Sequence, residues 1–82
     1  MTDRTAAALS DRQRRIFKFV AEHIGEKGYA PSVREITVAT GISSTSVVEY
    51  NIARLEAKGY LLRQEGIARG LILRKSLSDL PN

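Results

Sequence analysis

The stretch from Gly41 to Gly59, GISSTSVVEYNIARLEAKG, constrains the fold more than any other part of the chain. A glycine and several small hydroxyl side chains open it, and a helical pattern follows. Val48, Ile52 and Leu55 recur at the spacing i, i+4, i+7, which places them on one buried stripe of a helix. The preceding segment 32–40, SVREITVAT, has the length of a short helix. Two helices joined by a tight turn predict a helix-turn-helix.

The shorter helix of this unit is expected from Val33 to about Thr40. Ser32 and Glu35 have the spacing of a capping box just after a proline, which is a strong start signal. Gly41 should end the helix, because glycine adopts the backbone of a tight turn without strain. The inward-facing residues are expected to be Ile36 and either Ala39 or Thr40.

The longer helix is expected to start at a cap formed by Ser43 or Ser44 and to end at Gly59 as its C-terminal cap. Lys58 lies in the last turn, where a cation suits the negative end of the helix dipole. The side opposite the buried stripe carries mostly polar residues. These are Ser44, Thr45, Ser46, Glu49, Tyr50 and Arg54.

Another helix precedes this unit, from Asp11 to about Lys27, with a capping box at Ser10 and Gln13 and a stop at Gly28. His23 falls within its apolar arc, and we interpret it as a structural core residue rather than a ligand or catalyst. The apolar arc consists of Ile16, Phe17, Phe19, Val20 and Ile24. Arg12, Arg14, Arg15 and Lys18 form either a solvated face or a face on which one or two residues contact phosphate.

After the third helix the pattern changes from helical to extended. Tyr60–Gln64 and Arg69–Arg74 are predicted strands joined by a turn over Glu65–Ala68, which contains a glycine. The fold class is therefore mainly α (α+β), a winged helix-turn-helix with three helices followed by a two-stranded β-hairpin wing. We divide the chain into a flexible N-terminal arm at 1–9, this domain at 10–74, and a C-terminal tail or linker at 75–82.

Composition limits the chemistry that the chain can perform. It has 82 residues, no cysteine and one histidine, so we expect one small domain with no disulfide, metal site, catalytic constellation or cofactor. The net charge of +4 favours an anionic partner. Long apolar runs and a signal peptide are missing, so we expect a cytoplasmic protein that does not contact a membrane.

The polar face of the third helix suits the major groove of DNA. Short side chains at Ser44, Thr45 and Ser46 let a helix approach base edges closely. Glu49 can accept a hydrogen bond from a cytosine amino group; alternatively it is a plain surface acid or an i, i+4 partner. Tyr50 can stack on a sugar, touch a thymine methyl group, or pack on its own helix.

The predicted hairpin adds basic residues beside this helix. Arg63, Arg69 and Arg74 offer phosphate contacts or a minor-groove probe. Gly66 and Gly70 allow a twist or a close backbone approach. The alternative is a solvent-exposed ribbon whose charges serve solubility.

These motifs together resemble one known family. The order LSDRQRRIFKFVAEHIGEKGYAPSVREI, TGISSTSVVEYNIARLEAKGYL and EGIARGLIL is similar to the N-terminal DNA-binding domain of the LexA repressor. The resemblance covers Leu9 to about Arg74. It implies a repressor of DNA-damage (SOS) genes that binds double-stranded DNA as a homodimer on palindromic operators, with helix three in the major groove and the wing on the backbone or minor groove.

The resemblance also implies roles for individual residues. The base-reading set is Ser44, Ser46, Val47, Glu49 and Tyr50. The set expected at the DNA backbone is Ser10, Arg12, Gln13, Thr45, Arg54, Ala68 and Arg69. Three positions depart from the family's pattern: Tyr50, where Glu or Gly is frequent, Asn51, where His is frequent, and Thr40, where an apolar residue is usual. The family's operator sequence therefore does not carry over.

Family members continue into a second domain with an Ala-Gly cleavage site and a Ser/Lys dyad, and nothing after Lys75 supplies these. We therefore expect no enzyme activity, in either an excised domain or a short relative. The alternative function is a protein-interaction winged helix without sequence-specific DNA binding, because a fold does not fix a function.

Overall fold

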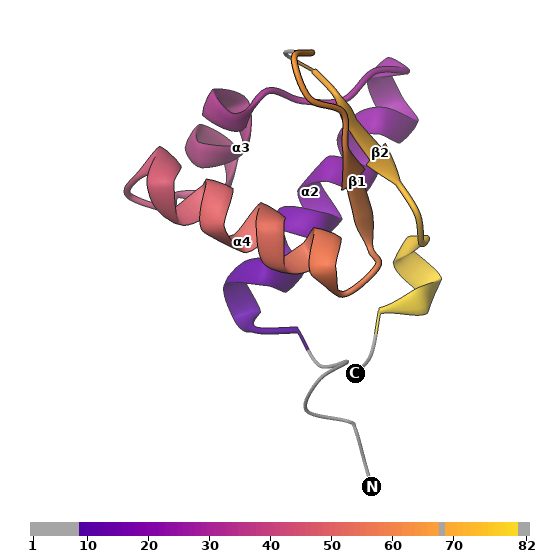
Figure 1. Ribbon diagram of the computed structural model, residues 1–82, viewed down its shortest axis with the longest axis horizontal. Helices are drawn as coiled ribbons and strands as arrows, with labels where there is room; N and C mark the ends of the chain where they lie inside the picture. The colour runs from indigo at the N-terminus through magenta and orange to yellow at the C-terminus, as the bar shows by residue number, and fades with distance from the viewer. Residues whose placement is uncertain (1–8, 68, 81–82) are drawn as a thin grey trace, which may run out of the picture.

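The computed structural model describes residues 9–67 and 69–80 (Figure 1). Three helices precede a two-stranded antiparallel hairpin and a short 3-10 turn, which confirms the predicted winged helix-turn-helix. The elements are α2 (Asp11–Lys27), α3 (Val33–Thr40), α4 (Thr45–Ala57), β1 (Leu61–Arg63), β2 (Leu71–Leu73) and η1 (Leu77–Asp79).

Capping boxes start α2 and α3, as their sequences predict. Ser10 Oγ accepts from the Gln13 N–H at 3.1 Å, and Gln13 Oε1 accepts from the Ser10 N–H at 3.2 Å. Ser32 and Glu35 make the same reciprocal pair at 3.1 and 2.9 Å. These bonds satisfy backbone donors that the first turn of a helix would otherwise leave unpaired.

The ends of α4 resolve two details of the prediction. Ser44, and not Ser43, is the N-cap, because its Oγ accepts from the Val47 N–H at 3.2 Å. Lys58 is the C-cap, so Gly59 follows the cap instead of forming it. Gly59 has a φ of 86°, and the Tyr60 N–H donates to the Leu55 carbonyl at 2.9 Å. This is a Schellman arrangement, which turns the chain into the hairpin.

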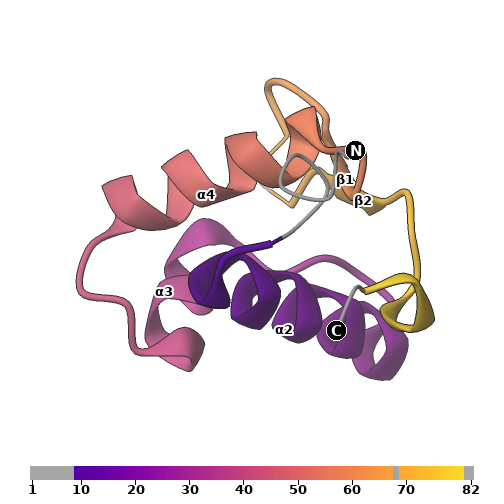
Figure 2. The same cartoon turned by 90° about the horizontal axis from the view of Figure 1, so that it is seen from below.

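One apolar core lies between the helices and the hairpin. Figure 2 shows α4 and the hairpin as one layer that faces α2 and α3. Phe19 and Ile24 are only partly buried at its edge, and Ala39 is exposed, so Thr40 is the half-buried residue of that pair. The fully buried side chains from α2, α3, α4 and β1 are Ile16, Phe17, Val20, Ile36, Val48, Ile52, Leu55 and Leu61.

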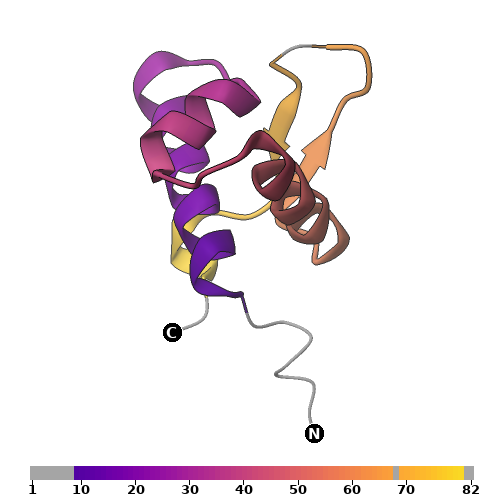
Figure 3. The same ribbon diagram turned by 90° about the vertical axis from the view of Figure 1, so that its left-hand side faces the viewer.

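The hairpin is shorter in strand and longer in loop than the sequence predicts. Its register pairs Leu61 with Leu73, and the ladder is extended by a bond from the Gln64 N–H to the Gly70 carbonyl at 2.9 Å. Figure 3 shows the two strands beside α4, with the loop at the free end. A Cβ on Gly70 would lie 2.7 Å from the Gln64 carbonyl oxygen, which explains why glycine occupies this position.

The described part of the C-terminal segment folds back on the domain. The turn η1 contacts α2, and the Lys75 ammonium lies 4.8 Å from the centre of the Tyr60 ring. Among the described residues, no helix is long and apolar enough to cross a membrane. The same residues include no cluster of side chains suited to a metal ion.

Candidate nucleic-acid interface

The N-terminal half of α4 presents a polar face to solvent. Thr45, Ser46 and Glu49 are exposed, and 63% of the Tyr50 surface is accessible. Val47 is half-buried and packs against the core, so its outer edge alone remains open. Ser44 is half-buried at the N-cap, where its side chain accepts a hydrogen bond from the Val47 N–H. The predicted base-reading residues therefore lie at the N-cap and in the first turns of α4, and Ser46, Glu49 and Tyr50 are the exposed ones.

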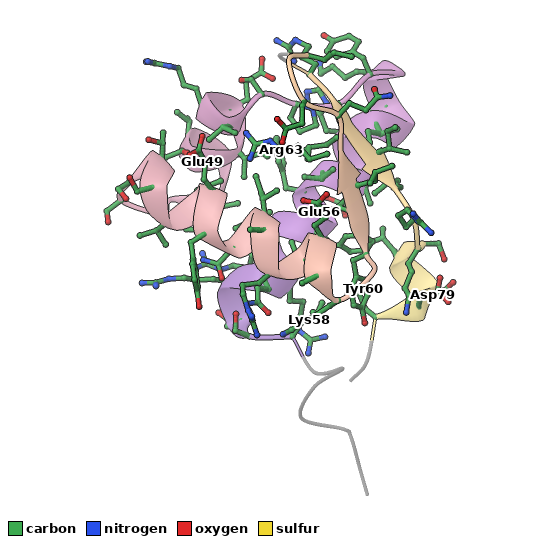
Figure 4. All side chains as sticks on the ribbon, viewed as in Figure 1. Glu49, Glu56, Lys58, Tyr60, Arg63 and Asp79 are labelled. Carbon is green, nitrogen blue, oxygen red and sulfur yellow. The ribbon has the colours of Figure 1, made fainter. Side chains whose placement is uncertain are left out.

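Glu49 has a partner in the hairpin. Its Oε2 lies 3.8 Å from Arg63 Nη2, and Figure 4 shows the two side chains pointing toward each other from α4 and β1. The Arg63 backbone N–H also donates to Glu56 Oε2 at 3.4 Å. A cation beside Glu49 lowers the repulsion that a carboxylate would meet near phosphates, so the pair suits a base-reading acid.

A groove separates the beginning of α2 from α4. It brings two residues predicted at the DNA backbone, Ser10 and Arg12, near the exposed side of α4. Both are exposed, whereas Gln13 is not. The groove is lined by Ser10, Asp11, Arg12, Gln13, Ser46, Val47, Tyr50 and Asn51.

Gln13 and Asn51 form a buried polar link at the base of this groove, with exposures of 6% and 5%. Gln13 Nε2 donates to Asn51 Oδ1 at 3.2 Å, and Asn51 Nδ2 donates to the Val47 carbonyl at 2.8 Å. The Lys58 ammonium donates to Gln13 Oε1 at 2.9 Å. The Gln13 side chain therefore holds α2 against α4 instead of facing outward to a phosphate.

The other arginines of α2 differ in how far they are committed to the fold. Arg15 lies 3.6 Å from Asp11 and donates to the Thr40 carbonyl at 2.9 Å. Arg14 is half-buried, while Arg12 and Lys18 are exposed. Arg12 is thus the arginine of this run that combines exposure with a place at the groove.

In the wing, Arg69 is bound to the helical part of the domain. Its Nη1 and Nη2 donate to Glu35 Oε1 and Oε2 at 2.7 and 3.0 Å, and Nη1 also donates to the Ala30 carbonyl at 3.0 Å. The guanidinium carbon lies 5.1 Å from the centre of the Tyr29 ring. We call Arg69, Glu35, Tyr29 and Ala30 the wing anchor. Ala68, also predicted at the DNA backbone, lies outside the described residues.

The two charged members of the wing anchor, Arg69 and Glu35, shift each other's pKa values. Hydrogen bonds from Arg69, and next from the Ser32 N–H, lower the pKa of Glu35 from 4.5 to about 2. The Glu35 carboxylate in turn raises the pKa of Arg69 above its usual value. Both groups are therefore charged at neutral pH.

His23 lies behind this ion pair and serves the fold. Its Nδ1 is 3.0 Å from the Tyr29 carbonyl oxygen, and its Nε2 is 3.9 Å from Glu35 Oε1. Its ring meets the Tyr29 ring edge-on at 5.4 Å and the Phe19 ring at 5.5 Å. His23 is thus buried and packed between aromatic rings, as its place in the apolar arc predicts.

Sequence reasoning missed two of these links because their partners are remote. Gln13 and Asn51 are 38 positions apart, and Arg69 and Glu35 are 34 apart. A signal did exist for Asn51: it completes the spacing of Val48, Ile52 and Leu55 on the buried side of α4. Arg69 carried no comparable signal, because a basic wing residue suits solvent, phosphate or an ion pair equally.

Comparisons with known proteins identify the family of this chain. The family described as "LexA DNA binding domain" matches residues 6–70. A LexA repressor of Herpetosiphon aurantiacus is 43% identical over 92% of this chain and 35% of its own length. LexA repressors of Corynebacterium diphtheriae and Geobacillus thermodenitrificans are 42% and 51% identical over 90% and 67% of this chain, and 31% and 27% of their own lengths. The chain thus spans about a third of these relatives.

Proposed function

Because the chain belongs to the LexA DNA-binding domain family, we propose that it is a sequence-specific repressor that binds double-stranded DNA at promoter operators. The observation that carries this proposal is the exposed polar face of α4 between the basic start of α2 and the wing. Relatives named LexA repressor support the same assignment. We extend the proposal to regulation of DNA-damage genes and to a cytoplasmic location.

In this proposal α4 enters the major groove with its first turns against base edges. Its N-terminus suits DNA because short side chains permit close approach and the helix dipole is positive there. Glu49 selects cytosine through its amino group, and Arg63 holds the carboxylate in place. The base-reading residues are Ser44, Ser46, Val47, Glu49 and Tyr50.

The contacts to the DNA backbone come from exposed groups on α4 and at the groove beside it. We assign phosphate contacts to Ser10 and Arg12 at the groove, and to Thr45 and Arg54 on α4. Ala68 remains assigned to the wing contact through its backbone. Gln13 acts behind this surface, because its side-chain amide is committed to Asn51 and Lys58.

We also propose that two copies occupy a palindromic operator. One winged helix reads a short half-site, and a two-fold DNA sequence presents two equivalent half-sites. A linkage between the copies would raise the effective concentration for the second binding step and hence the affinity.

The experiment that tests the proposal is selection of bound duplexes from a random pool, followed by affinity measurements on the selected site. Wild-type protein should enrich one motif. Glu49→Ala should shift the preference at one base pair by about 1–3 kcal/mol. Arg12→Ala should instead weaken binding to all sequences alike and reduce the salt slope of log K by about 0.9 for each bound copy.

Arg63→Ala is the matched control for Glu49→Ala, because it frees the carboxylate without removing it. Arg63→Ala should prefer the same base pair as the wild type, but by a smaller margin. Enrichment of no motif, together with duplex affinity that does not depend on salt, would overturn DNA recognition and favour a protein-interaction module.

A further inference from the structure

We propose that Arg69 is a positioning residue that fixes the wing on the N-terminus of α3 through Glu35, and that it does not bind DNA phosphate. The inference rests on the proposed DNA-binding function and deepens it. It assigns the most conspicuous cation of the wing to the frame of the domain, and leaves the phosphate contacts to residues nearer the recognition helix.

The geometry commits most of the guanidinium to the protein. Arg69 makes three hydrogen bonds, two to the Glu35 carboxylate and one to the Ala30 carbonyl. A guanidinium has five N–H groups in a rigid fork, and a bidentate pair with a carboxylate uses that fork fully along one edge. The ring of Tyr29 covers its face at 5.1 Å. Turning Arg69 toward a phosphate would break all of these contacts.

The fixed position of Glu35 makes it still more costly for Arg69 to bind a DNA phosphate. The Glu35 carboxylate stands at the third position of α3 and also accepts from the Ser32 N–H at 2.9 Å. It is therefore held in place by its own helix, independently of Arg69. If Arg69 left for DNA, this carboxylate would remain next to the wing and would repel the phosphates.

The hairpin needs such an anchor. Its strands have three residues each, and an isolated two-stranded hairpin of this kind is only marginally stable. Its inner face packs on the core through Leu61 at the start of β1 and Leu71 at the start of β2. Arg69 lies on the far side of the loop and ties that end of the wing to α3.

The test compares Arg69→Ala, Glu35→Gln and the double variant. Glu35→Gln is the sharper change, because glutamine keeps the capping box with Ser32 but removes the ion pair. On the duplex selected by the wild type, each single variant should weaken binding about three- to tenfold, and the double variant no further, since both remove one interaction. The slope of log K against log salt should stay at the wild-type value.

Amide hydrogen exchange of the free protein gives a readout that needs no DNA. The Gln64 N–H, which bonds to the Gly70 carbonyl, should exchange faster in both single variants. Arg69→Lys should behave like Arg69→Ala, because an ammonium keeps the charge but cannot form the fork. Arg54→Ala is the control: it should reduce the salt slope and leave the exchange of Gln64 unchanged.

Two results would overturn the inference. The first is a salt slope reduced by about 0.9 for each bound copy in Arg69→Ala, together with unchanged or tighter binding in Glu35→Gln, which marks a phosphate contact. The second is unchanged exchange of Gln64 in both variants. If the wild type selects no duplex at all, the DNA-binding proposal fails, and the exchange measurement still decides whether the anchor holds the wing.

Discussion

At the scale of single residues, the Glu35 carboxylate accepts hydrogen bonds from both the Ser32 N–H and Arg69. These bonds should make the stability of the fold depend on pH in the acidic range. Arg69 and the Ser32 N–H lower the pKa of Glu35 to about 2, and His23 also faces it. Since the folded-state pKa lies below the ordinary value of 4.5, ionised Glu35 stabilises the fold at higher pH, and this contribution is lost as the pH falls toward about 2.

We therefore expect the free energy of unfolding to fall more steeply between about pH 4.5 and pH 2 in the wild type than in Glu35→Gln. Urea denaturation of both proteins across this interval measures the difference. Parallel curves would show that the Glu35 ion pair contributes nothing to folding.

Gly70 offers a second test at the same scale. An alanine Cβ would approach the carbonyl oxygens of Gln64 and Ile67 to 2.7 and 3.0 Å, and backbone atoms cannot move aside cheaply. Gly70→Ala should cost about 1–3 kcal/mol of stability.

Gly25→Ala is the matched control. The position lies in α2 with nothing within 4 Å of an added Cβ, so alanine should stabilise by about 0.5–1 kcal/mol. Thermal or urea unfolding distinguishes the two substitutions, and equal effects would refute the steric argument.

At the scale of elements, α2 and α4 are joined by a polar link inside an otherwise apolar contact. Gln13 and Asn51 are both buried, so removing either leaves the other with an unpaired polar group. Gln13→Ala and Asn51→Ala should each cost about 1–3 kcal/mol. The double variant should cost less than the sum, as urea unfolding of all three proteins would show.

The exposed Gln64→Ala serves as the comparison and should stay within about 0.5 kcal/mol of the wild type. Full additivity of Gln13→Ala and Asn51→Ala would mean that the two side chains act independently, despite the hydrogen bond between them.

Local signals predicted the elements well and the hairpin less well. The capping boxes at Ser10 and Ser32 and the glycine stops at Gly28 and Gly41 act within a few residues, so the sequence itself contains both partners. The strands are shorter at both ends than the predicted segments 60–64 and 69–74. Their limits depend on how the loop closes over Gly70, which is a matter of tertiary contact.

The candidate site also has features that local sequence predicts and features that it does not. Helical periodicity fixes the exposed and buried sides of α4 together, so the outward position of Ser46, Glu49 and Tyr50 follows from the sequence. The commitments of Gln13 and Arg69 do not, because each depends on a side chain that the fold brings from more than 30 positions away.

At the scale of the whole molecule, a small domain with a net charge of +4 should bind duplex DNA with a strong dependence on salt. Each phosphate neutralised releases counterions, so log K should fall linearly with log salt, with a slope of about −0.9 for each contact. The proposed contacts from Arg12 and Arg54 in two copies predict a slope of about −3.6 from these residues alone. Titrations of the selected duplex at several salt concentrations measure it.

The exposed and buried sides of α4 should tolerate substitution differently. Tyr50 lies on the open side, so under the proposed base-reading role its replacement changes the preferred operator while the core stays intact. Asn51 is its neighbour in sequence but belongs to the scaffold, so its exchange calls for a compensating change at Gln13. Two adjacent positions of α4 are thus constrained differently: Tyr50 by what the exposed face contacts, and Asn51 by its hydrogen bond to Gln13.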